Sequence, residues 1–290
     1  MKKLLILTFA LTILLVSCND DDDEGPGTDE LTLNITGLED LGSGFAYEGW
    51  IIVDGNPVST GIFTVDGSGN LSETTFDVDA DDLESATMFV LSIEPSPDPD
   101  PSPALTKLLA GPFNGTTANL STSTVGSDFG TATGEYIIAA PTGTGAMNET
   151  KSGIWFLDNS SGSPMAGLDL PALEPGWKYE GWAVISGMPV TTGTFTSVSM
   201  ADADAPFSGT NPGPPFPGED FLMNAPSGLT FPTDLSGGMA VISIEPDPDN
   251  SPAPFTLKPL AGMIPSNLTG GPYEMDNNAN ASFPAGSVSR

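Results

Sequence analysis

The chain contains no histidine and a single cysteine, Cys18. Without histidine it lacks the general base of Ser-His-Asp and Cys-His catalysis and the commonest zinc ligand. One cysteine cannot form an internal disulfide, so packing must stabilise any core. The sequence also has no glycine-rich motif of the P-loop or dinucleotide-binding type. These absences predict a protein that is not an enzyme and uses no cofactor.

Basic residues are also scarce. The 290 residues include 7 Lys and Arg against 38 Asp and Glu, which gives a formal net charge of −31. Proteins that bind nucleic acid need basic patches to displace counterions from the phosphates, so nucleic acid is not expected as a partner. The same charge repels anionic lipid head groups, and only a covalent lipid would hold such a chain at a membrane.

Long apolar runs are confined to Leu4–Val16, which follows Lys2 and Lys3. Thirteen residues are fewer than the ~20 that a transmembrane helix needs. A positive start, a short apolar segment and a small-residue ending are typical of a secretory signal peptide. The ending Leu-Val-Ser-Cys resembles a bacterial lipobox. We predict that residues 1–17 are a lipoprotein signal peptide and that Cys18 receives the lipid that anchors the chain to a membrane.

The next segment, NDDDDEGPGTDE, has no apolar residue and cannot offset the entropy of becoming ordered. We predict a lipidated cysteine and a disordered acidic tether over residues 18–30. An acidic cluster beside a lipidated cysteine resembles the export signal of surface lipoproteins in Bacteroidetes-like bacteria, and a plain solvated spacer is the alternative. The expected location is the cell envelope, at the outer membrane and, if the signal is used, at the cell surface.

An internal repeat organises the rest of the chain. Tyr47–Thr64 matches Tyr179–Thr196 at 11 of 18 positions, and Ser92–Gly111 matches Ser243–Gly262 at 12 of 20. The spacing between the copies grows from 132 to 151 positions, which predicts a loop insertion near Asp204–Leu222. The repeat therefore indicates a duplicated module.

Each copy has the pattern of short strands. In Tyr47–Val53, strand alternation places Tyr47, Ile51 and Val53 on one face and Glu48, Trp50 and Ile52 on the other, and Asp54-Gly55-Asn56-Pro57 favours a hairpin turn. The fold class predicted is all-β, with two tandem β-sandwich (Ig-like) domains at residues 31–145 and 146–290. Tyr136–Ala140 is expected to finish the first domain and Gly153–Leu157 to open the second, with a polar joint between them.

The order Tyr-x-Gly-Trp, then Gly-x-Pro-Val-x-x-Gly-x-Phe, then Ser-Ile-Glu-Pro before a Pro-rich loop resembles the C-terminal domain of anti-sigma-K factors (RskA). The resemblance covers roughly residues 33–113 and 168–264. It implies a β domain outside the cytoplasmic membrane, which in that family is linked through a transmembrane helix to a sigma-binding domain. Without histidine or a second cysteine, a zinc-binding anti-sigma module is not expected here. The resemblance therefore implies an extracytoplasmic sensing or binding role.

Two sets of charged residues are candidate sites. Asp77, Asp79 and Asp81 alternate and offer oxygen ligands for Ca²⁺, although the segment fails the EF-hand pattern and a solvated loop is the alternative. Few lysines occur, yet a glutamate and a lysine recur at matched positions of the two copies. We predict one structural ion pair in each copy, Glu94–Lys107 in the first and Glu245–Lys258 in the second.

Aromatic residues complete the candidates. Trp50 and Trp182 lie on alternating strands and are expected in the core, whereas Trp155 and Trp177 lie near turns and are the first candidates to stack on a carbohydrate. The predicted function is a non-enzymatic envelope lipoprotein that binds or senses an envelope protein or glycan. A structural or adhesive surface spacer is one alternative, and a carbohydrate-active enzyme using paired carboxylates is another.

Overall fold

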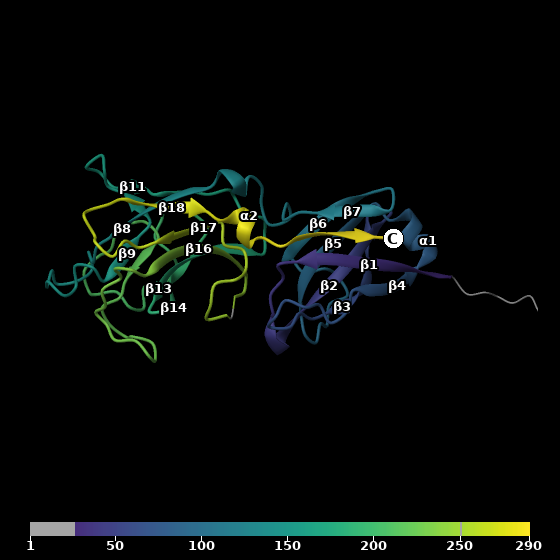
Figure 1. Cartoon of the computed structure of the whole chain (residues 1–290), viewed down its shortest axis with the longest axis horizontal. Coiled ribbons are helices and arrows are strands. Elements are labelled where there is room, and N and C mark those ends of the chain that lie inside the picture. Colours follow the sequence, from purple (N-terminus) through teal and green to yellow (C-terminus); the bar gives the residue numbers. More distant parts are fainter. Residues whose placement is uncertain (1–26, 250) are drawn as a thin grey trace, which may run out of the picture.

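The computed structural model describes residues 27–249 and 251–290, which form two β-rich units side by side along the long axis of the molecule (Figure 1). Each unit is one antiparallel sheet whose two edge strands approach each other, so that the sheet curls into a nearly closed, sandwich-like barrel. The predicted all-β, sandwich-like fold is confirmed. The predicted signal peptide, Cys18 and residues 19–26 of the predicted tether lie outside the described residues.

The first unit contains an eight-stranded sheet and one short helix. Its strands, in spatial order, are β3 (Asn56–Phe63), β2 (Phe45–Val53), β5 (Met88–Pro95), β6 (Lys107–Asn114), β7 (Thr117–Leu120), β19 (Ala285–Ser289), β1 (Thr28–Thr36) and β4 (Thr75–Asp79). The helix α1 (Ala80–Ser85) follows β4, and a 3-10 turn η1 (Gly42–Gly44) precedes β2.

The second unit repeats this order in a nine-stranded sheet. Its path runs through β14 (Met188–Phe195), β13 (Trp177–Ile185), β16 (Met239–Pro246), β17 (Leu260–Met263), β18 (Tyr273–Asn277), β8 (Thr133–Ile138), β9 (Gly153–Trp155) and β15 (Gly218–Asp220). The short β12 (Leu168–Asp169) also pairs with β8, and β10 (Leu157–Asp158) pairs with β11 (Met165–Ala166).

The hairpins β2–β3 and β13–β14 show why the repeated sequence folds the same way twice. Asp54 and Gly55 at the first turn have φ of 51° and 79°, and Ser186 and Gly187 at the second have 54° and 83°. Such left-handed pairs are the turn that best matches the twist of two antiparallel strands. Both hairpins also shift register directly after the glycine of the Tyr-Glu-Gly-Trp motif. The predicted turn is confirmed.

Two strands lie in the sheet of the other unit, contrary to the expected order. β8, expected to finish the first domain, pairs with β18 and β9 in the second sheet. β19, at the end of the sequence, pairs with β1 and β7 in the first sheet, and the yellow segment that leads from α2 to this strand crosses from one unit to the other in Figure 1. The chain therefore crosses between the units at residues 121–132 and again at 278–284, and the polar joint at residues 141–152 lies within the second unit.

The reason for this correction is that strand alternation shows which residues face a core but not which sheet accepts the strand. β8 and β19 occupy equivalent places, each beside the equivalent strand β18 or β7. The two crossing segments contain η2 (Phe129–Thr131) and α2 (Ala279–Ser282). Phe129 and Phe283 pack edge to face at 5.1 Å, and the Asn277 side chain donates to the carbonyl oxygens of Phe129 and Ala132 at 2.8 and 2.9 Å. The crossings thus pack against each other, and the largest apolar cluster runs through both units.

The first strand begins earlier than predicted. The disordered tether was expected to extend to Glu30, but β1 starts at Thr28, and Thr28, Asp29 and Glu30 pair with β4. Their side chains are exposed, so the backbone ladder rather than apolar burial holds this end of the strand. Within residues 27–249 and 251–290, no helix has the length and apolar character needed to span a membrane.

Candidate functional site

A pocket of about 90 Å³ lies where the two units meet, and we call it the interunit pocket. The first unit contributes the segment before β2 and the start of that strand, and the second contributes the end of β16 and the Pro-rich loop that follows it. Its acidic lining residues are Glu39, Asp40, Glu245 and Asp249, and its apolar ones include Leu41, Phe45, Ile93 and Phe255. Carboxylates and apolar surface from both units therefore converge on one small cavity.

Backbone contacts hold Glu39 in this pocket. The buried Tyr47 hydroxyl donates to the Glu39 carbonyl oxygen at 3.0 Å, and the Glu39 amide lies 3.3 Å from the same hydroxyl. Burial raises the pKa of the Glu39 carboxyl to about 7, with smaller increases from the charges of Asp249 and Asp40 and an opposing effect of Lys258. Burial lowers the pKa of Lys258, which Glu39 and Glu245 partly offset. Four acidic residues and no basic one therefore line the pocket, and the charge of the partly buried Lys258 acts on Glu39 and Glu245 from outside the lining.

A hydrogen-bonded chain connects the second sheet to the pocket. Trp182 Nε1 donates to Ser243 Oγ at 2.7 Å, Ser243 donates to Glu245, and the Phe255 amide donates to Glu245 Oε1 at 2.9 Å. Glu180 lies directly opposite Ser243 in the β13–β16 ladder, so alternation places all these polar groups on one face of the sheet. The strand pair therefore presents a buried polar row to the Pro-rich loop.

The first unit repeats this chain residue for residue. Trp50 Nε1 donates to Ser92 Oγ at 2.8 Å, Ser92 donates to Glu94, and the Ala104 amide donates to Glu94 Oε1 at 2.8 Å. Glu48 lies opposite Ser92, as Glu180 lies opposite Ser243. Both repeated tryptophans are buried, as predicted, and each is 2% exposed. The role of the serines was not predicted, although their recurrence in Ser-Ile-Glu-Pro was a signal for it.

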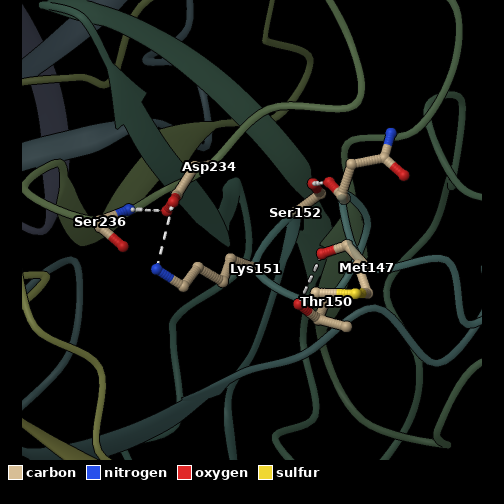
Figure 2. Close-up of polar contacts among 7 residues, drawn as sticks. Met147, Thr150, Lys151, Ser152, Asp234 and Ser236 are labelled. Atoms are coloured by element: carbon tan, nitrogen blue, oxygen red, sulfur yellow. Dashed lines mark hydrogen bonds and ion pairs between the residues drawn. The ribbon is translucent and has the colours of Figure 1, made fainter.

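The predicted glutamate–lysine ion pairs are wrong. Glu94 and Glu245 accept hydrogen bonds from serine and backbone donors, and Lys107 Nζ donates to the Ala104 carbonyl oxygen at 3.1 Å. Among the described residues, Lys151 pairs with Asp234 at 3.3 Å, drawn in Figure 2, and Lys178 pairs with Asp247 at 3.0 Å. At longer range, the Lys107 charge lowers the pKa of the Glu94 carboxyl, and the Glu245 charge raises the pKa of Lys258.

Figure 2 also shows how the polar joint is held in the second unit. Lys151 extends to Asp234, whose Oδ1 accepts the Ser236 amide at 2.9 Å, and Thr150 donates to the Met147 carbonyl oxygen at 3.1 Å. The Leu235 amide also donates to the Lys151 carbonyl oxygen at 3.1 Å. The segment between β8 and β9 is therefore fastened to the loop before β16.

The predicted calcium ligands do not converge. Asp79 caps α1, where its Oδ1 accepts the amides of Asp81 and Asp82 at 3.0 and 3.1 Å. Asp77 is exposed on β4, opposite Glu30. Across residues 27–249 and 251–290, the acidic group whose oxygens come together is Glu180, Glu245 and Asp249, which we call the acidic triad. Alternation on a strand separates Asp77 and Asp79 along one face, and Asp79 is used as a helix cap.

The two tryptophans suggested as sugar platforms are buried instead. Trp155 and Trp177 are each 4% exposed. Trp155 Nε1 donates to Asp220 Oδ1 at 2.8 Å, and the Thr142 amide donates to Asp220 Oδ2 at 2.7 Å. Asp220 belongs to β15, inside the stretch expected to be a loop insertion, so part of that stretch is a strand that completes the second sheet. Trp177 packs against Phe255 with ring centroids 6.1 Å apart.

These features define an all-β protein of two duplicated units that exchange a strand and share an acidic pocket. Residues 24–107 match the family model described as "Anti-sigma-K factor rskA, C-terminal", which is less than a third of the chain. The predicted resemblance is therefore confirmed for the first copy, and for the second copy it stays a prediction. No curated protein and no solved structure matches the chain.

Proposed function

We propose that this chain is a non-enzymatic lipoprotein of the cell envelope that binds or senses a ligand outside the cytoplasm. The family match supports a relation to the outer part of anti-sigma factors. The apolar leader and Cys18 support export and anchoring through lipid, at the outer membrane or the cell surface. The absence of histidine and of a second cysteine supports a chain without a zinc-binding sigma-factor module.

The interunit pocket is the observation that carries the binding role. A concave site that gathers polar and apolar groups from two units is typical of ligand binding, whereas a spacer needs no shared cavity. The acidic lining, which contains Glu39, Asp40, Glu245 and Asp249 and no basic residue, favours a ligand that carries positive charge. An envelope protein or glycan would then interact with the chain through this ligand or through the conformation that the ligand stabilises.

The volume of the pocket weighs against the carbohydrate-active alternative. About 90 Å³ is well below the roughly 300–1,000 Å³ of pockets that enclose drug-sized ligands, and a sugar chain would need more room than this. The buried positions of Trp155 and Trp177 also remove the aromatic platforms that this alternative relied on. A small cationic group or an ion suits the pocket better.

Charge reversal at the pocket rim tests the binding role. Cells that produce the wild-type chain, Asp40→Lys or Asp77→Lys are cross-linked, and the envelope components attached to each are purified and compared. Both residues are exposed acids, but Asp40 lines the pocket and Asp77 lies on β4. We expect Asp40→Lys to lose a component that the wild-type chain and Asp77→Lys retain. Identical components for all three chains would instead favour the spacer.

A second measurement tests the anchoring. Cys18→Ser should move the chain from the membrane fraction to the soluble fraction, because no lipid can then be attached. Protease added to intact cells should digest the wild-type chain if it is displayed at the surface. A chain that stays in the membrane fraction after Cys18→Ser would contradict the lipid anchor.

A further inference from the structure

The acidic triad brings three carboxylates together at the edge of the interunit pocket. One oxygen from each of Glu180, Glu245 and Asp249 lies within 4.8 Å of the others. Glu180 is 5% exposed and Glu245 is fully buried, and Glu245 and Asp249 line the pocket. Burial, with a smaller contribution from the Asp249 charge, raises the pKa of Glu180 to about 7 and that of Glu245 to about 8. Acids held this close require protons or a cation to neutralise them.

Glu180 has an oxygen that the protein does not satisfy. Thr191 donates to Glu180 Oε1, whereas Oε2 is buried and has no hydrogen-bond partner among the described residues. A buried carboxylate oxygen without a donor is unfavourable by about 1–3 kcal/mol or more, and such groups are rare in folded proteins. The pKa of Glu180 is affected by burial, by Thr191 and by Asp249, with no lysine or arginine of the described chain among the causes. This unpartnered oxygen therefore indicates a ligand that carries positive charge.

The first unit offers an internal comparison. Glu48, Glu94 and Asp98 occupy the positions equivalent to the triad in the repeat, and the Asp98 charge raises the pKa of both glutamates. Glu48 and Glu94 are also buried. However, the oxygens of these three residues are not among the converging groups of the described chain. The same residue types are present in both units, but they converge in the second unit only.

We propose that Glu180, Glu245 and Asp249 form a binding site for a divalent cation of the Ca²⁺ type, reached from the interunit pocket. Carboxylate oxygens are the ligands that Ca²⁺ prefers, and it accepts further oxygens from backbone carbonyls and water. The donor set contains neither imidazole nor thiolate, so it does not favour zinc or copper. This inference names the ligand class of the pocket described above and rests on the proposed binding role.

Calorimetric titration of the purified full chain with CaCl₂ tests the proposal, in buffer freed of metal and containing about 0.15 M KCl to screen the surface acids. We expect one saturable site per chain. Asp249→Asn should weaken it by about tenfold or more because one charged ligand is lost, whereas the matched Asp98→Asn should change it by less than about twofold. Both variants remove the same charge from equivalent loops, so general acidity cannot explain a difference between them.

Two further readouts keep the test independent of folding defects. Tb³⁺ bound at the triad should show luminescence on excitation of Trp182, which is linked to Glu245 through Ser243. CaCl₂ should also raise the unfolding temperature of the wild-type chain and of Asp98→Asn.

The proposal is overturned if the wild-type chain has no saturable site, or if Asp98→Asn weakens binding as much as Asp249→Asn does. Glu180→Gln, which keeps an acceptor for Thr191, should weaken binding as well, and unchanged affinity in this variant would also count against the site. If Ca²⁺ does not bind while Asp40→Lys still loses an envelope component, the cation site fails and the proposed function stands. If Ca²⁺ binds and Asp40→Lys loses nothing, the site stands and the partner binding fails.

Discussion

Val288 lies opposite Leu33 in the first sheet, although the two residues come from opposite ends of the described chain. On its other side, Val288 lies opposite Ala118 of β7. All three side chains are buried, so a strand from the end of the sequence fills the core of the unit formed mainly by the beginning. The first sheet is therefore incomplete without a strand that follows the second unit in the sequence. The stability of each unit depends on the other.

Substitution of Val288 should destabilise the whole protein rather than one unit. Val288→Ala removes two buried methyl groups and should lower the free energy of unfolding by about 1–3 kcal/mol. Val288→Asp should lower it much further, because an unpaired charge would be buried. Denaturation in urea, followed by tryptophan fluorescence and by circular dichroism, should give one coincident transition for the wild type and for Val288→Ala.

Ser289→Ala is the control, because Ser289 lies on the same strand and is exposed. It should leave the urea midpoint nearly unchanged. Two separate transitions in the wild-type chain, with only one of them shifted by Val288→Ala, would show that the units unfold independently and that the exchanged strand does not couple them.

The sequence predicts that the exchanged segments are strands but not which sheet each of them joins. Tyr136 and Val288 each follow a glycine by two positions, Gly134 and Gly286, and the four residues occupy equivalent places in the two sheets. The alternation correctly indicates strands, since it depends on which side chains are buried. It does not indicate which sheet supplies the neighbouring strands, because an alternating pattern is compatible with a place in either sheet.

The repeated serines should stabilise both units by similar amounts. Ser243→Ala leaves the Trp182 indole N–H without its acceptor and removes one donor from Glu245, both in buried surroundings. We expect a loss of about 1–3 kcal/mol in the free energy of unfolding, and a similar loss for Ser92→Ala. The measurement is urea denaturation of both variants beside Ser102→Ala, at an exposed position of the first Pro-rich loop. A loss no larger than that of the control would mean that water replaces the serine hydroxyl without penalty.

Asp220 should be among the most sensitive positions of the second unit. Its carboxylate accepts from Trp155 Nε1 and from both the amide and the hydroxyl of Thr142, and it is fully buried. Asp220→Ala leaves these donors unpaired and should lower the free energy of unfolding by about 3 kcal/mol or more. Asp220→Asn keeps an acceptor for one donor and should lose less.

The control for this position is Asp276→Ala, because Asp276 is an exposed strand residue of the same unit. Thermal unfolding monitored by circular dichroism ranks the three variants. Equal unfolding temperatures for Asp220→Ala and Asp276→Ala would contradict the structural role given to Asp220.

The polar site was less accessible to sequence reasoning than the strands were. The alternation of Tyr47–Val53 correctly placed Trp50 on the face opposite Tyr47 and Ile51, because these two belong to the main core and Trp50 packs in a separate, smaller apolar cluster. The acidic triad depends on how the Pro-rich loop returns, because Asp249 approaches Glu180 only through the fold of that loop. Side-chain spacing within one strand does not predict such an approach, and the alternating Asp77, Asp79 and Asp81 are the acids that this spacing indicates.

Buried acids should make the protein more stable in mild acid than in mild base. The pKa values of Glu180, Glu219, Glu245 and Asp202 are raised to about 7–8, with burial as the largest cause in each case. An unfolded chain titrates these groups near about 4, so between pH 4 and 8 the folded state holds more protons than the unfolded state does. The stabilisation is fully present below pH 4 and is lost as the pH rises through 7–8.

Urea denaturation between pH 5 and 8.5 should therefore show the urea midpoint falling as the pH rises. Glu245→Gln, which is always neutral, should flatten this dependence, while Asp276→Asn at an exposed site should not. The series is run at about 0.5 M KCl, because the net charge of −31 causes repulsion that would give the same direction at low salt. The urea midpoint could instead rise with pH, or it could depend on pH as steeply in Glu245→Gln as in the wild type. Either result would mean that Glu245 is ionised in the folded protein and that another group neutralises it.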